Sequence, residues 1–239
     1  MTKLAGILFD KDGTLVHFGA TWNPSLLEVM QAQAAGDAAA LHRLADMLDF
    51  DLAAGALRKT SGFIGGSWEE YGPLWAVALQ RPDAGALLEE TKLLVRAALA
   101  RNMAPVGDLP ALFGGLAARG LRLGISTNDS EAAARDLARQ TGLDAHLDFI
   151  AGYDSGHGAK PAPGMVTAFA RHLGVAPARI AMVGDSTHDL DAARHAGAVA
   201  IAVLTGPAGR CELSAHADHV IDTIEELPLF LDAFAASAA

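Results

Sequence analysis

The chain is expected to fold as an α/β protein, with a parallel sheet covered by helices on both faces and a helical segment inserted after the first strand. Between residues 121 and 221, short apolar runs alternate with helix-like segments, which is the pattern of β-α-β units. Residues 23–101 are instead rich in Ala, Leu and Glu at helical spacing and contain no convincing strand. One strand-like run precedes this helical zone, so the zone is an insertion rather than a separate domain at the start of the chain.

The predicted strands are short apolar runs. Residues 4–9 are uniformly apolar, as expected for a strand that is buried on both faces of a sheet. The later strands are expected at residues 121–126, 149–151, 180–183, 198–204 and 219–221. Helices are expected between them at residues 130–141, 163–173 and 187–196. Asn128 and Glu131 have the spacing of a capping box at the start of the first of these helices.

The insertion is predicted to consist of helices, interrupted by a loop at residues 61–67. Its apolar residues recur three and four positions apart, as in the series Leu26, Met30 and Ala34. Pro24 suits the first turn of a helix, and Gly36 suits a break between two helices. We therefore expect a helical domain at residues 17–101 and a sheet domain made of residues 1–16 and 102–239.

Composition excludes several classes of protein. The 239 residues carry a formal net charge of -10 with no basic run, which argues against a nucleic-acid-binding protein. A single cysteine excludes an intrachain disulfide and a cysteine metal cluster. No apolar run approaches the ~20 residues of a membrane helix, and no signal-peptide pattern precedes the first strand. We expect a cytoplasmic protein that binds neither nucleic acid nor membranes, and the sequence does not indicate its oligomeric state.

Asp10 and Asp12 are the most informative residues in the sequence, because they follow directly on the first predicted strand. Residues i and i+2 of an extended chain point to the same side, so the two carboxylates can face one spot. Gly13 allows the chain to turn sharply away from that spot. Two carboxylates held so close repel each other, and a divalent cation relieves the repulsion. One aspartate can then act as a nucleophile and the other as a general acid and base.

Three further polar clusters follow predicted strands, at the edge where open parallel sheets bind their ligands. They are residues 126–129, 158–163 and 184–189, which contain Thr127, Asn128, Lys160, Asp185 and Asp189. Together with Asp10 and Asp12, these clusters form an ordered set of motifs that resembles the haloacid dehalogenase superfamily, in particular its phosphoglycolate phosphatase-like branch. The resemblance covers essentially the whole chain. It implies a three-layer Rossmann-like core with an inserted helical cap domain of the C1 type.

The resemblance also implies a role for each motif residue. Asp10 would be the nucleophile that forms an aspartyl-phosphate, and Asp12 would protonate the leaving alkoxide and then activate water. Thr127 and Asn128 would donate hydrogen bonds to the transferring phosphoryl group. Lys160 would neutralise charge shared by the nucleophile and the phosphate.

The same resemblance implies a metal site. Asp185 would bind Mg²⁺ directly, together with Asp10 and the backbone carbonyl of Asp12. Asp189 would act through water or by orienting Lys160. Mg²⁺ suits this set because all the ligands are hard oxygens and are few enough to leave room for water and phosphate. Lys11, which stands where an apolar or aromatic residue is more common, is expected to point away from the active site.

Substrate specificity is expected to reside in the helical cap. The residues that could contact a substrate are His17, Trp22, Arg58, Lys59 and the loop at residues 61–66. Arg58 and Lys59 could attract an acidic substrate or form a solvated helix face, and Trp22 is more typical of cap core than of substrate stacking. The residues after Val16 depart from the Val-Asp-Ser continuation of phosphoglycolate phosphatase-like relatives, which leaves the substrate open.

These observations predict a Mg²⁺-dependent phosphatase that hydrolyses phosphate monoesters of small metabolites, with phosphoglycolate as the leading substrate. The alternatives are a pyrophosphatase or nucleotidase of the same fold, a phosphomutase, and a non-catalytic protein that binds phosphorylated metabolites. A dehalogenase is disfavoured, because the true dehalogenases of the superfamily lack an acid at the position of Asp12.

Overall fold

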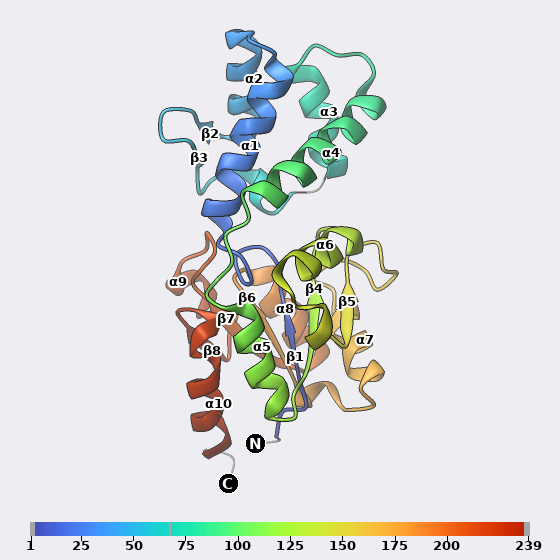
Figure 1. The fold of residues 1–239 in the computed structure, drawn as a ribbon, viewed down its shortest axis with the longest axis vertical. Coiled ribbons are helices and arrows are strands. Elements are labelled where there is room, and N and C mark those ends of the chain that lie inside the picture. The colour runs from blue at the N-terminus through green and yellow to red at the C-terminus, as the bar shows by residue number, and fades with distance from the viewer. Residues whose placement is uncertain (1–2, 67, 237–239) are drawn as a thin grey trace. The chain divides into compact units, whose positions relative to one another are not determined.

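The computed structural model describes residues 3–66 and 68–236, and these divide into two compact units (Figure 1). The sheet unit contains the described residues up to Phe18 and those from Pro105 onward. The helical unit is Gly19–Ala104. Among the described residues, no helix combines the length and the apolar composition that crossing a bilayer would require.

The sheet unit is built on six parallel strands in the order β5-β4-β1-β6-β7-β8, which confirms the predicted α/β fold. The strands are β1 (Gly6–Phe9), β4 (Arg122–Ser126), β5 (Phe149–Ala151), β6 (Ile180–Gly184), β7 (Val199–Val203) and β8 (His219–Ile221). β1 lies in the middle, with Phe9 paired to Ile125 of β4 and to Val183 of β6. The carboxyl ends of β4, β1 and β6 are therefore neighbours at one edge of the sheet.

Helices cover both faces of this sheet (Figure 1). They are α5 (Leu109–Ala118), α6 (Glu131–Thr141), α7 (Gly164–His172), α8 (Thr187–Ala196), α9 (Arg210–Leu213) and α10 (Leu227–Ala236), with short 3-10 helices at Asp144–His146, Pro177–Arg179 and Ile224–Glu226. On one face, Leu8 of β1 is buried in one cluster with Phe169 of α7 and Leu190 of α8. On the other face, the ring of Phe9 lies 4.8 Å from that of Phe113 in α5. Alternate residues of β1 thus pack against different helix layers, as a strand buried on both faces requires.

The residue that caps α6 differs from the prediction. The predicted capping box of Asn128 and Glu131 is wrong, because α6 is capped by Ser130, whose Oγ accepts a hydrogen bond from the Ala133 N–H at 3.3 Å. A capping box does form at α8, where Ser186 and Asp189 each accept a hydrogen bond from the other's backbone N–H. This box places the Asp189 carboxylate at the carboxyl edge of the sheet.

The helical unit contains α1 (Phe18–Ala34), α2 (Ala38–Leu48), α3 (Trp68–Ala78) and α4 (Ala84–Arg101), with a 3-10 helix at Gly62–Ile64. Its core includes Leu26, Met30, Leu44, Trp75 and Leu87. Two expectations are corrected. Pro24 lies inside α1 rather than at its start. The zone also contains a two-stranded hairpin, β2 (Phe50–Asp51) and β3 (Ala56–Leu57), whose strands of two residues are too short to show any periodicity.

Candidate active site

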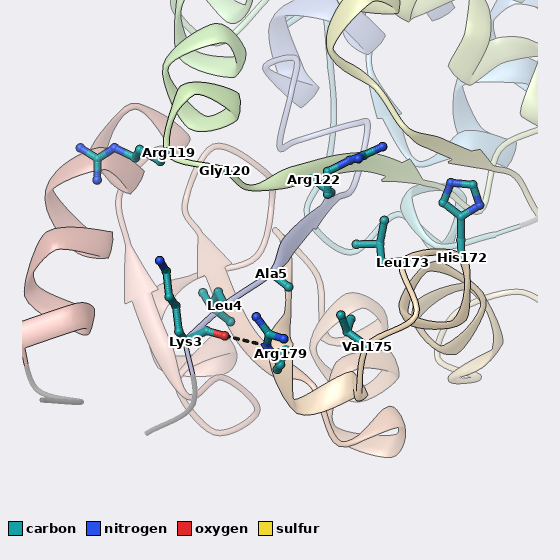
Figure 2. A pocket seen from close by; sticks show the side chains of 10 residues that line it. All are labelled: Lys3, Leu4, Ala5, Arg119, Gly120, Arg122, His172, Leu173, Val175 and Arg179. Carbon is teal, nitrogen blue, oxygen red and sulfur yellow. Dashed lines mark hydrogen bonds between the residues drawn. The ribbon is translucent and has the colours of Figure 1, made fainter.

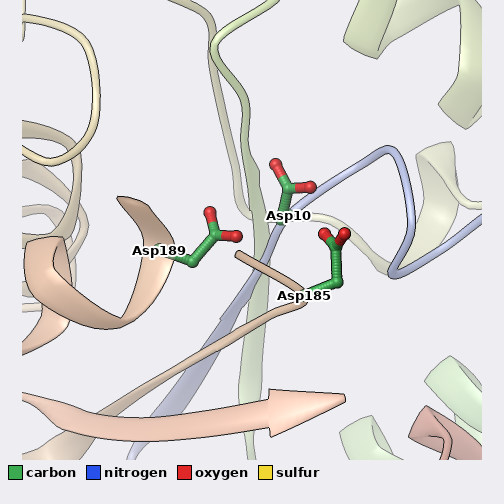
Figure 3. A group of neighbouring side chains, drawn as sticks. All are labelled: Asp10, Asp185 and Asp189. Carbon is green, nitrogen blue, oxygen red and sulfur yellow. The ribbon is translucent and has the colours of Figure 1, made fainter. Parts of the chain in front are cut away.

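The carboxyl edge of the sheet gathers three buried aspartates. Asp10 follows β1, Asp185 follows β6, and Asp189 lies in the first turn of α8. Figure 3 shows these three carboxylates clustered together, and one oxygen of each lies within 4.8 Å of one oxygen of each of the others. Their exposed fractions are 8%, 5% and 1%, so the negative charge is almost entirely removed from water.

Lys160 places its ammonium group among these acids. Its Nζ lies 2.5 Å from Asp10 Oδ1, 2.5 Å from Asp189 Oδ1 and 3.0 Å from the carbonyl oxygen of Ser126. These three acceptors use all the hydrogens of the ammonium group. Burial opposes the charge on Lys160, but attraction to the two carboxylates outweighs it and raises the pKa of the lysine. Lys160 is therefore a permanent cation that holds one oxygen of Asp10.

Two residues fix the position of Lys160. The Asn128 side chain accepts from the Lys160 N–H at 2.8 Å and donates to the Lys160 carbonyl at 2.9 Å. Asp189 receives the ammonium on Oδ1, while its Oδ2 accepts from the N–H of Ser186 at 3.1 Å and from the Ser186 hydroxyl at 2.6 Å. The side-chain amide of Asn128 is thus committed to the loop that carries Lys160, and both oxygens of Asp189 are already engaged.

Thr127 presents a hydroxyl beside this cluster. Its Oγ1 accepts a hydrogen bond from the Asp129 N–H at 3.0 Å, and the residue is buried. A hydroxyl that accepts in this way still has its own hydrogen to donate. Thr127 is therefore suited to bind an anionic oxygen at the end of β4.

Lys11 does not point away from the active site, so that expectation is wrong. Its ammonium is buried and lies 2.5 Å from Asp12 Oδ2 and 3.1 Å from Asp129 Oδ2. Attraction to these two carboxylates exceeds the cost of burial and raises the pKa of the lysine. Lys11 thereby links Asp12 to Asp129, whose backbone N–H donates a hydrogen bond to the Thr127 hydroxyl.

Two glycines enclose the carboxylate of Asp185, and sequence reasoning missed one of them. A Cβ atom on Gly13, where φ is +81°, would lie 2.3 Å from Asp185 Oδ2, and one on Gly206 would lie 1.7 Å from the same oxygen. Thr205, beside Gly206, donates a hydrogen bond to the Gly13 carbonyl. The only signal for Gly206 in the sequence is its place just after the strand predicted at residues 198–204.

Replacing Gly206 with Ala is expected to reduce turnover roughly a hundredfold, because an added methyl group must displace the Asp185 carboxylate by about an ångström. The position has no positive φ, so the effect is steric rather than conformational. Gly209→Ala is the matched control, since no atom lies within 4 Å of the Cβ that it would add. Steady-state rates of the two variants test this, and equal rates would show that Asp185 tolerates displacement.

The acids outnumber the cations that balance them. Burial, with repulsion from Asp189 and Asp12, raises the pKa of Asp10 to about 7 against the attraction of Lys160. Burial and repulsion from Asp10 and Asp189 also raise the pKa of Asp185 well above its usual range. A divalent cation would relieve this excess of negative charge. Since both oxygens of Asp189 are engaged, Asp10 and Asp185 are the members of this cluster best placed to hold a divalent cation.

These raised pKa values predict how stability depends on pH. Between pH 3.8 and about 7, folded Asp10 binds more protons than unfolded Asp10, so the free energy of unfolding of the metal-free protein falls as pH rises. Asp185 acts in the same direction. Thermal unfolding with a chelator should therefore show a melting temperature that declines from pH 5 to pH 8. The decline should be shallower in Asp185→Asn and unchanged in Asp46→Asn, an exposed control. Parallel curves for all three proteins would refute this electrostatic account.

The residues predicted to contact substrate differ in their exposure and in their contacts. His17 is exposed just before α1. Trp22 packs in the helical unit, with its ring 5.9 Å from that of Phe63, as expected of a core residue. Arg58 is already paired, at 3.2 Å from Asp49 and 3.0 Å from Asp51. Lys59 is exposed and forms no ion pair with any residue that the structure describes.

Comparisons with known proteins identify similar sequences and structures. A family model described as haloacid dehalogenase-like hydrolase matches residues 4–197. The chain is 32% identical over 211 residues to a phosphoglycolate phosphatase from Rhodospirillum rubrum, which covers 84% of this chain and 79% of that protein. It is 25% identical over 232 residues to an N-acetylmuramic acid 6-phosphate phosphatase from Pseudomonas aeruginosa, covering 96% of each. A HAD family hydrolase from Deinococcus radiodurans, with bound phosphate and sodium, shares the fold with a TM-score of 0.68 at 24% identity, covering 95% of this chain and 94% of that one.

Proposed function

The chain belongs to the haloacid dehalogenase-like hydrolase family, as its four motifs implied, and we propose that it is a Mg²⁺-dependent phosphatase of small phosphorylated metabolites. The observation that carries this proposal is the buried contact of Lys160 with Asp10, beside Asp185 and at the end of the central strand. The Lys160 ammonium binds one oxygen of the Asp10 carboxylate, and Asp185 is close enough to Asp10 for the two to bind one metal ion. Two phosphatases among the relatives support the reaction class.

The proposed reaction has two in-line steps at phosphorus. In the first, a carboxylate oxygen of Asp10 forms a bond to phosphorus, the bond from phosphorus to the ester oxygen breaks, and protonated Asp12 gives its proton to the leaving alkoxide. In the second, Asp12 takes a proton from water, the water oxygen bonds to phosphorus, and the bond to Asp10 breaks. The products are an alcohol and inorganic phosphate, and the enzyme returns to its starting state.

The remaining residues stabilise charge and geometry in both steps. Lys160 and the Thr127 hydroxyl would hold oxygens of the transferring phosphoryl group. Asn128 would act chiefly through its two hydrogen bonds to the Lys160 backbone, which position the lysine. Asp189 would act through its ion pair with the Lys160 ammonium. Lys11 would hold the Asp12 carboxylate in place between its two proton transfers.

Mg²⁺ fits the donor set and would be held by Asp10, Asp185 and the backbone carbonyl of Asp12. When bound, it supplies positive charge that offsets the phosphate and the carboxylates and so permits an anionic nucleophile to approach an anionic substrate. We propose phosphoglycolate as the leading substrate, on the strength of the relative from Rhodospirillum rubrum.

Phosphate release across a panel of substrates tests this function. The panel contains phosphoglycolate, a sugar 6-phosphate, a nucleoside monophosphate, pyrophosphate and an aryl phosphate, each with Mg²⁺ and with a chelator. We expect Mg²⁺-dependent release from monoesters, with phosphoglycolate the best of them. Preference for pyrophosphate or the nucleotide would overturn the substrate class. Isomerisation of the sugar phosphate without release would indicate a mutase, and binding without turnover would indicate a non-catalytic protein.

A further inference from the structure

A pocket that the proposed catalytic residues do not line lies in the sheet unit (Figure 2). Its volume is about 420 Å³, which is within the range of sites for small organic molecules. It is lined by Lys3, Leu4, Ala5, Arg119, Gly120, Arg122, His172, Leu173, Val175 and Arg179. No acidic residue is among them, although the chain carries a formal net charge of -10.

The strand directions place this pocket at the opposite edge of the sheet from the aspartates. Ala5 precedes β1 and Asp10 follows it, so the strand separates them by about 17 Å at ~3.3 Å per residue. Arg122 is the first residue of β4, and Arg179 directly precedes β6. Since all three strands are parallel, the pocket lies at their amino ends, and a ligand there would not touch Asp10.

The cationic side chains of the pocket differ in whether they form ion pairs. Arg119 pairs with Asp232 at 2.7 Å, and Arg122 pairs with Asp148. Lys3 and Arg179, by contrast, form no ion pair with any residue in the described parts of the chain. Arg179 donates through Nε to the Lys3 carbonyl at 3.1 Å, which fixes the base of its guanidinium and leaves the terminal nitrogens available. Lys3 and Arg179 therefore each bring to the lining a charge that has no ion-pair partner among the described residues (Figure 2).

Besides these cations, Gly120 and His172, the lining consists of apolar side chains. Leu4 and Ala5 contribute from the segment just before β1, and Leu173 and Val175 contribute from the segment after α7. These side chains cannot bind a phosphate, but they can cover the carbon skeleton of a molecule that carries one. The lining thus has a cationic part suited to a dianion and an apolar part suited to an organic group.

We propose that this pocket binds a phosphorylated small organic molecule, with its phosphate on Lys3 and Arg179 and its carbon skeleton on Leu173 and Val175. No described residue of the lining carries a carboxylate that could act as a nucleophile, so the molecule is bound there without being hydrolysed. This site is additional to the proposed catalytic site and does not depend on it.

Amide chemical shifts of the full-length protein, measured by NMR with Mg²⁺ present, test this proposal. The probe is phenylphosphonate, whose carbon–phosphorus bond withstands phosphatase action and which combines a dianion with an apolar ring. Two controls separate its features: inorganic phosphate is a dianion without a ring, and benzyl alcohol carries a ring without a charge. Phenylphosphonate is expected to shift the amides of residues 3–5, 119–122 and 172–179 saturably, and to bind more tightly than either control. Shifts confined to the catalytic edge of the sheet would overturn the proposal.

Variants separate the proposed contacts from general effects of charge. Lys3→Gln with Arg179→Gln should weaken binding at the pocket at least tenfold, while phosphate release from substrate stays unchanged. Lys3→Gln alone keeps the backbone acceptor of Arg179 and should weaken binding several-fold, which guards against a loss that merely reflects misfolding. Arg171→Gln removes one charge from α7 outside the lining and should leave the affinity unchanged. Equal affinity in the double variant and the wild type would refute the site.

Discussion

Replacing Asp10 with Asn is expected to lower phosphate release at least about a thousandfold, because an amide cannot form the acyl-phosphate bond on which both proposed steps depend. The substitution preserves the size of the side chain and an oxygen to accept from Lys160. The measurement is kcat/KM for the best substrate of the panel at saturating Mg²⁺. Asp46→Asn makes the same chemical change at an exposed position on α2 and should leave the rate unaltered.

Stability distinguishes this chemical loss from unfolding. The carboxylate of Asp10 is buried among other acids and its pKa is raised to about 7, so neutralising it should not lower the melting temperature of the metal-free protein. A variant that is inactive and equally or more stable supports a nucleophile. Retention of more than a tenth of the activity would show that another group attacks phosphorus.

Replacing Lys160 with Met has the largest expected effect on stability. Among the described residues, Lys160 is the one cation that contacts both Asp10 and Asp189, and leaving these buried carboxylates without their partner costs about 3–5 kcal/mol of unfolding free energy. Activity should also fall at least about a hundredfold, since the transferring phosphoryl group loses a preorganised cation. Denaturant unfolding of the metal-free protein at pH 7 and steady-state rates measure the two effects.

Lys59→Met is the matched control, because Lys59 is exposed and has no ion pair within the described residues. It should change neither stability nor rate appreciably. The cost of Lys160→Met should shrink at pH 5, where Asp10, whose pKa is about 7, has taken up a proton and needs its partner less. A pH-independent cost, or a cost no larger than that of Lys59→Met, would mean that the ion pairs contribute little.

The sheet and the positions of the site residues could be predicted because both depend on local patterns. A buried parallel strand reads as an apolar run, and the polar residue that follows it must lie at the ligand-binding edge. Asp10, Thr127 and Asp185 each follow a predicted strand in this way. Lys160 follows no regular strand directly, and it was identified through its motif.

Side-chain directions could not be predicted, because distant residues decide them. Lys11 turns inward since Asp129, at the end of another strand, completes its ion pair with Asp12. Arg58 is held by Asp49 and Asp51 across a hairpin whose strands are too short to recognise. Gly206 matters because of the carboxylate that it faces, and nothing adjacent to it in the sequence reveals Asp185.

Local competition explains the errors in secondary structure. Asn128 has the spacing of a helix cap, but its side chain forms hydrogen bonds with the backbone of Lys160. Ser130 caps α6 instead. The helix α5 was not predicted, and its interior pair Gly114 and Gly115 disfavours a helix by propensity alone. Packing of Phe113 on Phe9 of the central strand compensates for that propensity.

The central claim is that Asp10 carries the phosphoryl group, and trapping that adduct tests it most directly. The enzyme is quenched during turnover with Mg²⁺ and substrate, reduced with borohydride, digested, and analysed by peptide mass spectrometry. An acyl-phosphate at Asp10 would be reduced to homoserine, so we predict homoserine at position 10 only when both substrate and Mg²⁺ are present. Sustained turnover with Asp10 unmodified, and with the reduced residue elsewhere or absent, would contradict the account.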